Sequence, residues 1–470
     1  MEAWECSSRR VGRVCAGWVF PLHPGFQKWA VRTGCAKCRR MLRELHLQGV
    51  GPAPRLDVEF APRLNVLTGD NGLGKSFLLD VAWWSLTGTW PGLPAWPHRG
   101  AKRRRIDWAL TGKTQRASNK TSHFDPERQL WPWPEGRPSM PGLTVYARVD
   151  GSFSVWDPAR NYWHKTSRSD PDLPRRPDAF HFSPQDLWEG LKYEGKTVCN
   201  GLVRDWLTWQ LQDDGSAHSP FQMLKRALEQ LSPKDEPIRP GRPTRLAVED
   251  VQDYPTIDMP YGTIPVVHAS AGMRRILGLA YLIVWAWHEH TQASAFLGKP
   301  RDPRFILLVD EVETHLHPLW QRRIVGSLIQ VIDGLARETS VQTFLTTHSP
   351  LVLASLEPFF DEEQDALFLF QLERGQVNLR HLPWAKQGDA NDWLTSPVMG
   401  LAQARALETE RAVEAAEAYM RGAREGVGTL KEIDAELRRL LPEQDPFWPR
   451  WVVARDGGGG RDPVRSKKRA

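Results

Sequence analysis

The chain has 470 residues, a formal net charge of +6 and a sequence pI of about 9.1. This length allows one large domain with insertions, or two domains. The positive charge is concentrated in local clusters, notably "KRRR" at 102–105 and "RSKKR" at 465–469. Such clusters permit contact with nucleic acid but do not establish it, because charge runs are usually solvated surface.

The longest apolar run, at 276–287, is shorter than the roughly 20 residues needed to cross a bilayer. No signal-peptide pattern precedes it, so we expect a cytoplasmic protein without a membrane partner. Five cysteines in this length do not indicate a disulfide scaffold. Cys35 and Cys38, with Cys6 and Cys15 upstream, could form a zinc site, but their spacing fits no common zinc module.

The first 40 residues differ from the rest, with little periodicity and four of the five cysteines. We treat 1–40 as an N-terminal extension of uncertain structure. From Met41 onward, the segments 42–50, 55–60 and 63–69 alternate apolar and polar residues as short strands do. Met41 could therefore be the translation start, or 1–40 could be an ordered extension; the sequence leaves both open.

The segment from about 86 to 142 is rich in Pro, Trp, Gly and Arg, which predicts an irregular insertion. A hairpin is expected at 143–158, and helices at 201–212 and 220–231 lie in a helical insertion of about 185–235. A further strand pair is expected near 244–250 and 264–270.

The stretch "RFILLVDEVE" at 304–313 is a continuous apolar run that ends in acids, as in a parallel strand covered on both faces. "VQTFLTTHSP" at 341–350 repeats this pattern with a polar end, and 366–382 predicts a late hairpin. We assign 41–385 to the main domain, 386–455 to a C-terminal helical region and 456–470 to a disordered basic tail.

The stretch "GDNGLGKS" follows a predicted strand and precedes a predicted helix, and it matches the phosphate-loop pattern G-x-x-x-x-G-K-[ST]. Its backbone amides and the helix N-terminus suit ATP phosphates, its lysine can reach the terminal phosphates, and its serine can coordinate Mg²⁺. The nucleotide-binding candidates here are Gly69, Asp70, Asn71, Gly72, Gly74, Lys75 and Ser76. The alternative is a glycine-rich turn that happens to contain Lys-Ser.

Asp310 and Glu311 stand at the end of the second apolar strand. A carboxylate at Asp310 can hold the magnesium water shell opposite Ser76, and Glu311 can polarise a water molecule for attack on the γ-phosphate. Acids at strand ends are common in α/β proteins, but their combination with a phosphate loop is not.

A third motif, "HASAGMRRI", places Ser270 and Gly272 at the start of an apolar helix. With these motifs in order, the chain resembles the soluble ATP-binding-cassette (ABC) ATPases that include the SMC, Rad50, RecF and overcoming-lysogenization-defect (OLD) proteins. The resemblance covers much of 41–350. It implies an α/β fold: an ABC-type P-loop ATPase with a mixed or parallel central sheet, an antiparallel β portion, helical insertions and C-terminal helices.

The resemblance also implies roles for individual residues. Ser270 and Gly272 would bind the γ-phosphate held by another subunit, and "ETHLHP" at 313–318 resembles the dimer-facing loop of this class. His348 would be the switch histidine at the γ-phosphate, and Gln185 would be the glutamine that senses phosphate and water.

Each of these motifs also has a simpler interpretation. Ser270 could be an ordinary helix N-cap, and a lone histidine is more often structural. His315 and His317, beside the acids, could alternatively form a metal cluster.

The chain lacks the long arms of the SMC and Rad50 proteins, and no set of acids after His348 predicts a Toprim nuclease domain. We therefore expect an ATP-hydrolysing ATPase that forms a homodimer or higher homo-oligomer through ATP. It would control a DNA transaction or a separately encoded effector such as a nuclease, in anti-phage defence. The alternatives are a RecF-like DNA repair ATPase and a slowly hydrolysing ATP-binding scaffold.

Overall fold

The computed structural model of the protein describes residues 41–98, 100–111, 117–134, 140–161, 178–335 and 339–457. The predictions for 1–40, including the zinc alternative, lie outside the described residues, as does the predicted tail beyond 457. Within the described ranges, no helix combines the length and the apolar character that crossing a bilayer requires.

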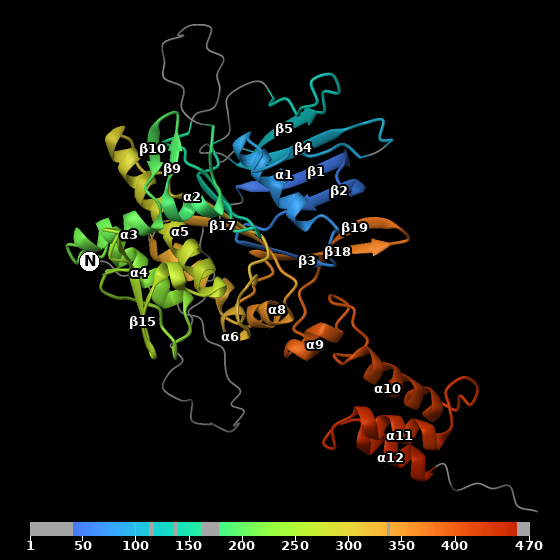
Figure 1. Ribbon diagram of the computed structural model, residues 1–470. Coiled ribbons are helices and arrows are strands. Elements are labelled where there is room, and N and C mark those ends of the chain that lie inside the picture. Colours follow the sequence, from blue (N-terminus) through green and yellow to red (C-terminus); the bar gives the residue numbers. More distant parts are fainter. Residues whose placement is uncertain are drawn as a thin grey trace, which may run out of the picture. The chain divides into compact units, whose positions relative to one another are not determined.

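A mixed sheet of eight strands forms the centre of the fold, in the order β19-β18-β3-β17-β16-β6-β7-β8 (Figure 1). The five strands from β18 to β6 are parallel, and antiparallel strands complete both edges. This confirms the predicted mixed central sheet and both predicted hairpins, at 143–158 and 366–382. The strands are β3 (Leu64–Gly69), β6 (Leu143–Ala147), β7 (Phe153–Trp156), β8 (Phe180–Phe182), β16 (Arg304–Val309), β17 (Ser340–Thr346), β18 (Asp365–Glu373) and β19 (Gln376–Leu382).

Both faces of this sheet are buried, because side chains of successive strand residues point to opposite sides. In β16, Phe305, Leu307 and Val309 join one core cluster, whereas Ile306 and Leu308 join the other. α1 (Lys75–Thr87) packs in the second cluster. The first cluster contains residues of α2 (Pro184–Glu189), α3 (Leu202–Leu211), α4 (Pro220–Leu231), α5 (Ala271–Phe296), α6 (Pro318–Gln321), α7 (Ile324–Leu335), α8 (Pro350–Leu356) and α9 (Ala390–Thr395).

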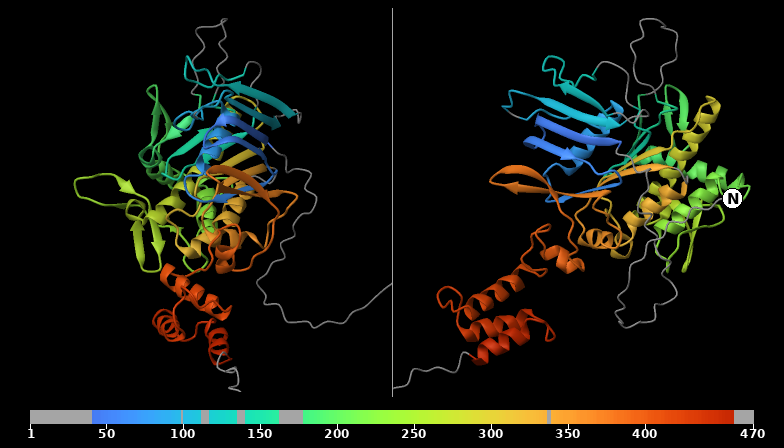
Figure 2. Two further views of the ribbon diagram at one scale, coloured as in Figure 1. Left: turned by 90° about the vertical axis from the view of Figure 1, so that its right-hand side faces the viewer. Right: turned by 180° about the vertical axis from the view of Figure 1, so that it is seen from behind.

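A second, antiparallel sheet packs in the same cluster as α1 and is coloured blue to cyan in Figure 2. Its order is β2 (Ala53–Glu59), β1 (Leu42–Val50), β4 (Arg105–Thr111) and β5 (Ala117–His123). The prediction that 86–142 is irregular was therefore wrong for β4 and β5. The Pro- and Trp-rich flanks masked β4, and β5 reads "ASNKTSH", which lacks an apolar alternation and becomes a strand by pairing along β4.

Three small β units complete the described sheets. The segments 244–250 and 264–270 do not pair with each other as predicted. Thr244–Arg245 pairs with Asp253–Tyr254, and Gly262–Pro265 pairs with Thr256–Met259, so each pairing closes a shorter loop than the predicted one. The units are β9 (Leu191–Tyr193) with β10 (Lys196–Cys199), β12 (Thr244–Arg245) with β13 (Asp253–Tyr254), and β11 (Arg239–Pro240) with β14 (Thr256–Met259) and β15 (Gly262–Pro265), which runs into the 3₁₀ turn Val266–His268.

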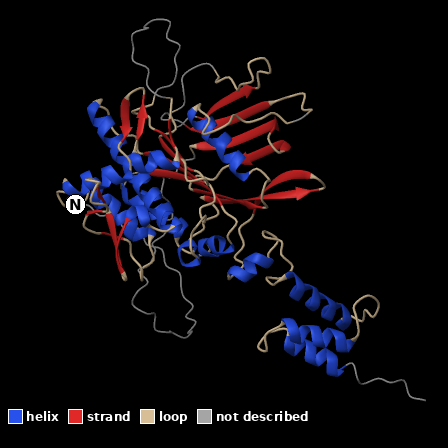
Figure 3. Ribbon diagram, viewed as in Figure 1, coloured by secondary structure: helices blue, strands red, loops and turns tan. Residues whose placement is uncertain are grey.

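The C-terminal helices, which are blue like every helix in Figure 3, have a small core of their own. They are α10 (Leu407–Met420), α11 (Leu430–Leu440) and α12 (Trp448–Gly457). α11 begins with a capping box, in which Thr429 and Glu432 each bond to the other's backbone N–H, so its start is encoded locally. The core residues are Ala412, Val413, Ala416, Ile433, Leu437, Leu441, Phe447 and Trp451.

Candidate functional site

The turn between β3 and α1 has the backbone shape of a phosphate-binding loop. Gly69, Gly72 and Gly74 have φ angles of 124°, 75° and 100°, which residues with a side chain rarely adopt. A Cβ at Gly69 would lie 2.1 Å from the carbonyl oxygen of Phe370, and one at Gly74 would lie 2.6 Å from Cγ of Pro52. Glycine is therefore required at both positions by space as well as by conformation.

Lys75 is the first residue of α1 and is only 5 % exposed. Its Nζ donates to the carbonyl oxygens of Gly69 at 2.8 Å and of Asp70 at 2.7 Å. Burial lowers the pKa of this ammonium group, and the negative charges of Glu311 and Asp310 oppose that decrease. The loop thus holds a buried cation on carbonyl groups that phosphate oxygens could replace as partners.

The two motifs meet at Ser76 and Asp310, which follows β16 directly. Ser76 Oγ donates to Asp310 Oδ1 at 3.0 Å. Thr346, the last residue of β17, donates to the same oxygen at 2.7 Å. Burial raises the pKa of Asp310, and the hydrogen bonds from Thr346 and Ser76 oppose this rise. Sequence reasoning did not single out Thr346, although the polar end of "FLTTHSP" was an available signal.

Glu311 is held in an unusual backbone conformation beside this pair. Its φ is +44°, in the left-handed region that non-glycine residues seldom occupy outside special sites. Its N–H donates to Thr346 Oγ1 at 2.7 Å, and its Oε2 accepts a bond from Thr314 Oγ1 at 3.1 Å. Thr346 therefore orients both neighbouring acids, through the carboxylate of Asp310 and the backbone of Glu311.

His348 follows β17 and is linked to the acidic turn through Glu313. The His348 N–H donates to Glu313 Oε1 at 2.5 Å. Burial and the positive charge of Lys75 lower the pKa of His348, so its imidazole is neutral at pH 7 and can donate one hydrogen bond. Burial raises the pKa of Glu313.

Ser270 and Gly272 lie at the start of α5, on its exposed end. Ser270 is the N-cap, and its hydroxyl accepts a bond from the Met273 N–H at 3.4 Å. Its side chain is exposed, and within the described ranges no hydrogen bond joins it to the phosphate loop. A Cβ on Gly272 would lie 2.6 Å from the carbonyl oxygen of His315. Gly272 is therefore needed for close packing of α5 on the turn after Glu311.

Comparison with known families bears on this arrangement. A family model described as "AAA domain, putative AbiEii toxin, Type IV TA system" matches residues 64–354, the interval that holds the phosphate loop, the acidic strand end and His348. The chain belongs to this family. The resemblance predicted from the motifs is thereby confirmed, and two relatives carry the name ATPase.

Three curated relatives match shorter parts of the chain. "Retron Ec83 probable ATPase" of Escherichia coli is 27% identical over 141 residues, which are 30% of this chain and 22% of the relative. "Retron Vc95 probable ATPase" of Vibrio cholerae is 40% identical over 60 residues, 13% of this chain and 10% of the relative. "Septu protein PtuA" of Bacillus mycoides is 35% identical over 100 residues, 21% of this chain and 13% of the relative. The matches thus span less than a quarter of each relative.

Two solved structures are similar to this chain at low identity. The "SMC head domain from Thermotoga maritima" has a TM-score of 0.36 and 15% identity, covering 73% of this chain and 100% of that chain. The "recombination mediator protein RecF-ATP in RecFOR pathway" has a TM-score of 0.36 and 12% identity, covering 74% of this chain and 99% of that chain.

Gln185 lies away from the cluster of residues described above. It is exposed on α2, after the edge strand β8, and its Nε2 donates to Glu189 Oε2 at 2.8 Å. β16 pairs with β17 on one side and with β6 on the other, and β6 is followed by Arg148. Burial raises the pKa of Asp310, and the positive charge of Arg148 opposes this rise. Sequence reasoning missed Arg148, since only the strand order brings it to this position.

The basic cluster at 102–105 is partly neutralised within the chain. Arg104 donates its Nε to the Ala101 carbonyl at 3.2 Å and lies over the Phe124 ring, while Arg105 pairs with Asp107 at 2.7 Å. The exposed side chains of 102 and 103 are the part of this cluster most accessible to an anionic partner.

The histidines of "ETHLHP" contribute to the local backbone structure. His317 is the N-cap of α6, and its Nδ1 accepts a bond from the Leu319 N–H at 3.3 Å. His315 has a φ of +65° and presents its carbonyl to α5. Among the described residues, no three His, Cys, Asp or Glu side chains are grouped to hold a metal ion, so the metal-cluster alternative gains no support.

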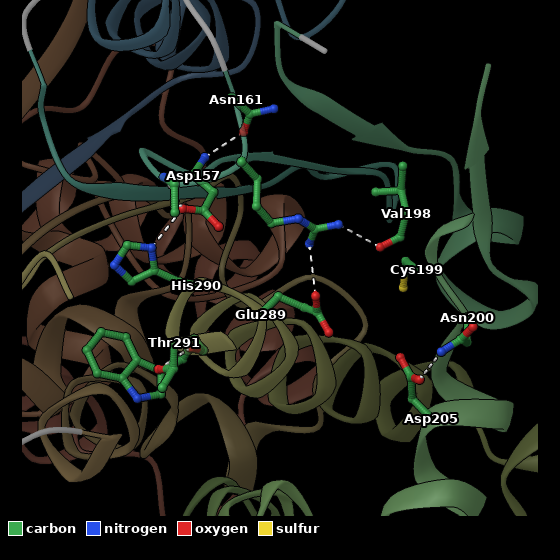
Figure 4. A network of polar contacts seen from close by, with 12 residues as sticks. Asp157, Asn161, Val198, Cys199, Asn200, Asp205, Glu289, His290 and Thr291 are labelled. Atoms are coloured by element: carbon green, nitrogen blue, oxygen red, sulfur yellow. Dashed lines mark hydrogen bonds and ion pairs between the residues drawn. The ribbon is translucent and has the colours of Figure 1, made fainter. Parts of the chain in front are cut away.

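A separate set of buried polar contacts holds α5 at Tyr281 and His290, and Figure 4 shows the surroundings of His290, Asp157 and Asp205. His290 Nε2 accepts a bond from the Asp302 N–H at 3.1 Å, so its proton is on Nδ1, which donates to Asp157 at 2.7 Å. Tyr281 Oη donates to Asp205 at 2.7 Å. These contacts hold α5 near its middle and toward its C-terminal end.

Proposed function

We propose that this protein binds and hydrolyses ATP with Mg²⁺, and that ATP closes two chains face to face. In this cycle, closure controls a separately encoded effector, such as a nuclease, or a DNA transaction in anti-phage defence. The family match and the relatives' names support an ATPase. Relatives named for a retron and for Septu support the proposed role in anti-phage defence.

The residues present fit a magnesium nucleotide. In our proposal the amides of the Gly69–Ser76 loop and the Lys75 ammonium receive the phosphates, at the N-terminus of α1. The Ser76 hydroxyl and the Asp310 carboxylate, 3.0 Å apart, supply the oxygen ligands that Mg²⁺ prefers. When bound, the ion neutralises charge on the phosphate oxygens.

Hydrolysis is assigned to the turn after β16. Glu311 accepts a proton from the attacking water, and its backbone is preset by Thr346 rather than left to solvent. His348, neutral at pH 7, donates a hydrogen bond to the γ-phosphate. Gln185 remains the predicted sensor of phosphate and water, although it is bonded to Glu189 in the structure.

One observation carries the dimer proposal: the exposed start of α5 makes no hydrogen bond to the phosphate loop of its own chain within the described ranges. A helix N-terminus with free N–H groups attracts anions, because these groups and the helix dipole are positive. Ser270 and Gly272 would therefore complete the site of a second chain. Binding energy from ATP is converted into association, and hydrolysis releases the pair.

The experiment uses Glu311→Gln, which should retain ATP and stop turnover. Addition of ATP and magnesium should then raise the mass measured by light scattering, through a dimer or a tighter larger assembly. Ser270→Arg in the same chain should block this change while ATP binding stays within about threefold of the parent. If light scattering showed no change in the mass or shape of Glu311→Gln protein on addition of ATP, the proposed mechanism would be wrong.

Mixed chains sharpen the test. Lys75→Ala and Ser270→Arg chains should each be inactive alone. In a mixed dimer both lesions fall on one composite site, so the other site is intact and activity returns. Mixtures no more active than either variant would contradict a site shared between chains.

A further inference from the structure

A buried arginine connects the start of α5 to the acidic end of β16. Arg275 lies five residues after Ser270 and is 7 % exposed. Its Nη1 donates to the Arg148 carbonyl at 2.7 Å, and its Nη2 donates to the Asp310 carbonyl at 3.3 Å. Its Nε is buried and has no hydrogen-bond partner among the described residues.

Burying the charged guanidinium of Arg275 costs desolvation free energy that an apolar side chain would not cost. Its guanidinium is compensated by two strand-end carbonyls and by the nearby charges of Asp310, Asp150 and Glu311. The planar fork is suited to this task, because it holds two acceptors at fixed separation. The ends of β6 and β16 are therefore tied by one side chain that belongs to α5.

A second contact joins the same two elements. Gly272 packs so closely on the turn after β16 that a Cβ would lie 2.6 Å from the His315 carbonyl. Within this turn Glu311 and His315 both have positive φ angles, of 44° and 65°. Backbone in this region persists only where its surroundings enforce it. The first two turns of α5 are part of those surroundings.

We infer that Arg275 is a positioning residue that transmits contact at Ser270 to Asp310 and Glu311 of the same chain. A partner's phosphate held at Ser270 fixes the start of α5, and Arg275 then fixes the strand end that presents the two acids. Arg275 thus positions the acids of its own chain in every dimer, and a filled partner site would add to this positioning. This inference rests on the proposed function, since it needs phosphate to arrive from a second chain.

The test compares Arg275→Met with Arg301→Met in the full chain. Arg301 is an exposed arginine just beyond the far end of α5, stacked on Trp287 at 4.6 Å, and it serves as the matched control. For Arg275→Met we expect ATP affinity and ATP-dependent association within about threefold of the parent, and turnover about 100-fold lower, the size expected when a reacting group is misplaced by about 1 Å. Arg301→Met should leave all three unchanged.

Arg275→Lys provides the conservative variant. It keeps the charge but can reach the two carbonyls only with a single ammonium group, so turnover should lie about 10-fold below the parent. If Arg275→Met does not fold, as a thermal melt would show, this variant decides the question. Parental turnover in it would overturn the inference.

Mixed dimers separate the inference from a general loss of structure. Arg275→Met placed on the Ser270→Arg chain, which supplies the working Glu311, should abolish the restored activity. The same change on the Lys75→Ala chain should reduce it by less than about threefold. Equal losses on both chains, or parallel losses of ATP affinity and turnover, would make Arg275 a scaffold residue only. Failure of Glu311→Gln to associate with ATP would instead defeat the proposed dimer.

Discussion

The phosphate loop and the start of α5 are both helix N-termini assigned to phosphate, yet they are built in opposite ways. Lys75 in the loop is buried and held by two carbonyls of its own chain. Ser270 is exposed, and among the residues that the structure describes its hydroxyl bonds only to the Met273 N–H of its own helix start. This difference supports our proposal that the loop is preorganised for binding, whereas the start of α5 is open to a phosphate held by another chain.

The largest effect is expected at Glu311, to which our proposal assigns the chemical step and not nucleotide binding. Glu311→Gln should lower turnover about 1,000-fold, since removing a general base typically costs factors of 10² to 10⁴. Nucleotide affinity, measured by fluorescence titration, should be unchanged. Equal loss of affinity and turnover would assign Glu311 a structural role.

Lys75→Ala should weaken ATP binding about 100-fold, because it removes a buried cation from the phosphates, an effect of about 3 kcal/mol. The exposed Lys431 in α11 provides the control, and its replacement by Ala should leave affinity unchanged. If both variants bound ATP as tightly as the parent, Lys75 would not be part of the phosphate site.

Gly272→Ala should destabilise the fold by about 2 kcal/mol and lower turnover, because the added methyl group overlaps the His315 carbonyl. Gly334→Ala is the matched control: that exposed helical glycine has nothing within 4 Å, so Ala should be neutral or slightly stabilising there. Denaturant midpoints would measure both. Identical midpoints for the two variants would show that the α5 contact tolerates more than its geometry indicates.

Asp80, in α1, lowers the stability of the folded chain because its carboxyl group is largely buried. Burial raises its pKa to about 6 from an ordinary value of 3.8, and the hydrogen bond from Tyr146 opposes this rise. The folded chain therefore binds this proton more tightly than the unfolded chain, so ΔG of unfolding falls as pH rises from 3.8 to about 6. Asp80→Asn should raise the free energy of unfolding by about 1–2 kcal/mol at pH 8. The increase should be smaller as the pH falls below 6. A gain independent of pH would contradict this assignment.

The smallest effect is expected at the basic cluster. Charge reversal at Lys102 and Arg103 should leave ATP binding unchanged and weaken any duplex binding with a decrease of about two in the salt slope, since Arg104 and Arg105 are already engaged within the chain. Filter binding at several salt concentrations would measure it. Loss of ATP affinity would place this cluster in the nucleotide site instead.

Much of this site could be predicted because its parts are local. The glycines of the loop, Lys75 and Ser76 lie within eight residues, and the acids end an apolar run that is typical of a buried strand. The helix starts at Ser270 and Thr429 are likewise encoded locally, because each cap bonds to a residue three positions later in the chain.

Tertiary structure alone decided which distant residues support these motifs. Thr346 contacts Asp310 from the neighbouring strand β17, and Arg148 lies near the site because β6 pairs with β16. Arg275 bonds to the ends of β6 and β16, which are far from it in sequence. β5 became a strand only by pairing with β4. The physical reason is that turns and caps satisfy hydrogen bonds within a few residues, whereas these contacts depend on which strands and helices become neighbours when the two faces of the sheet are buried.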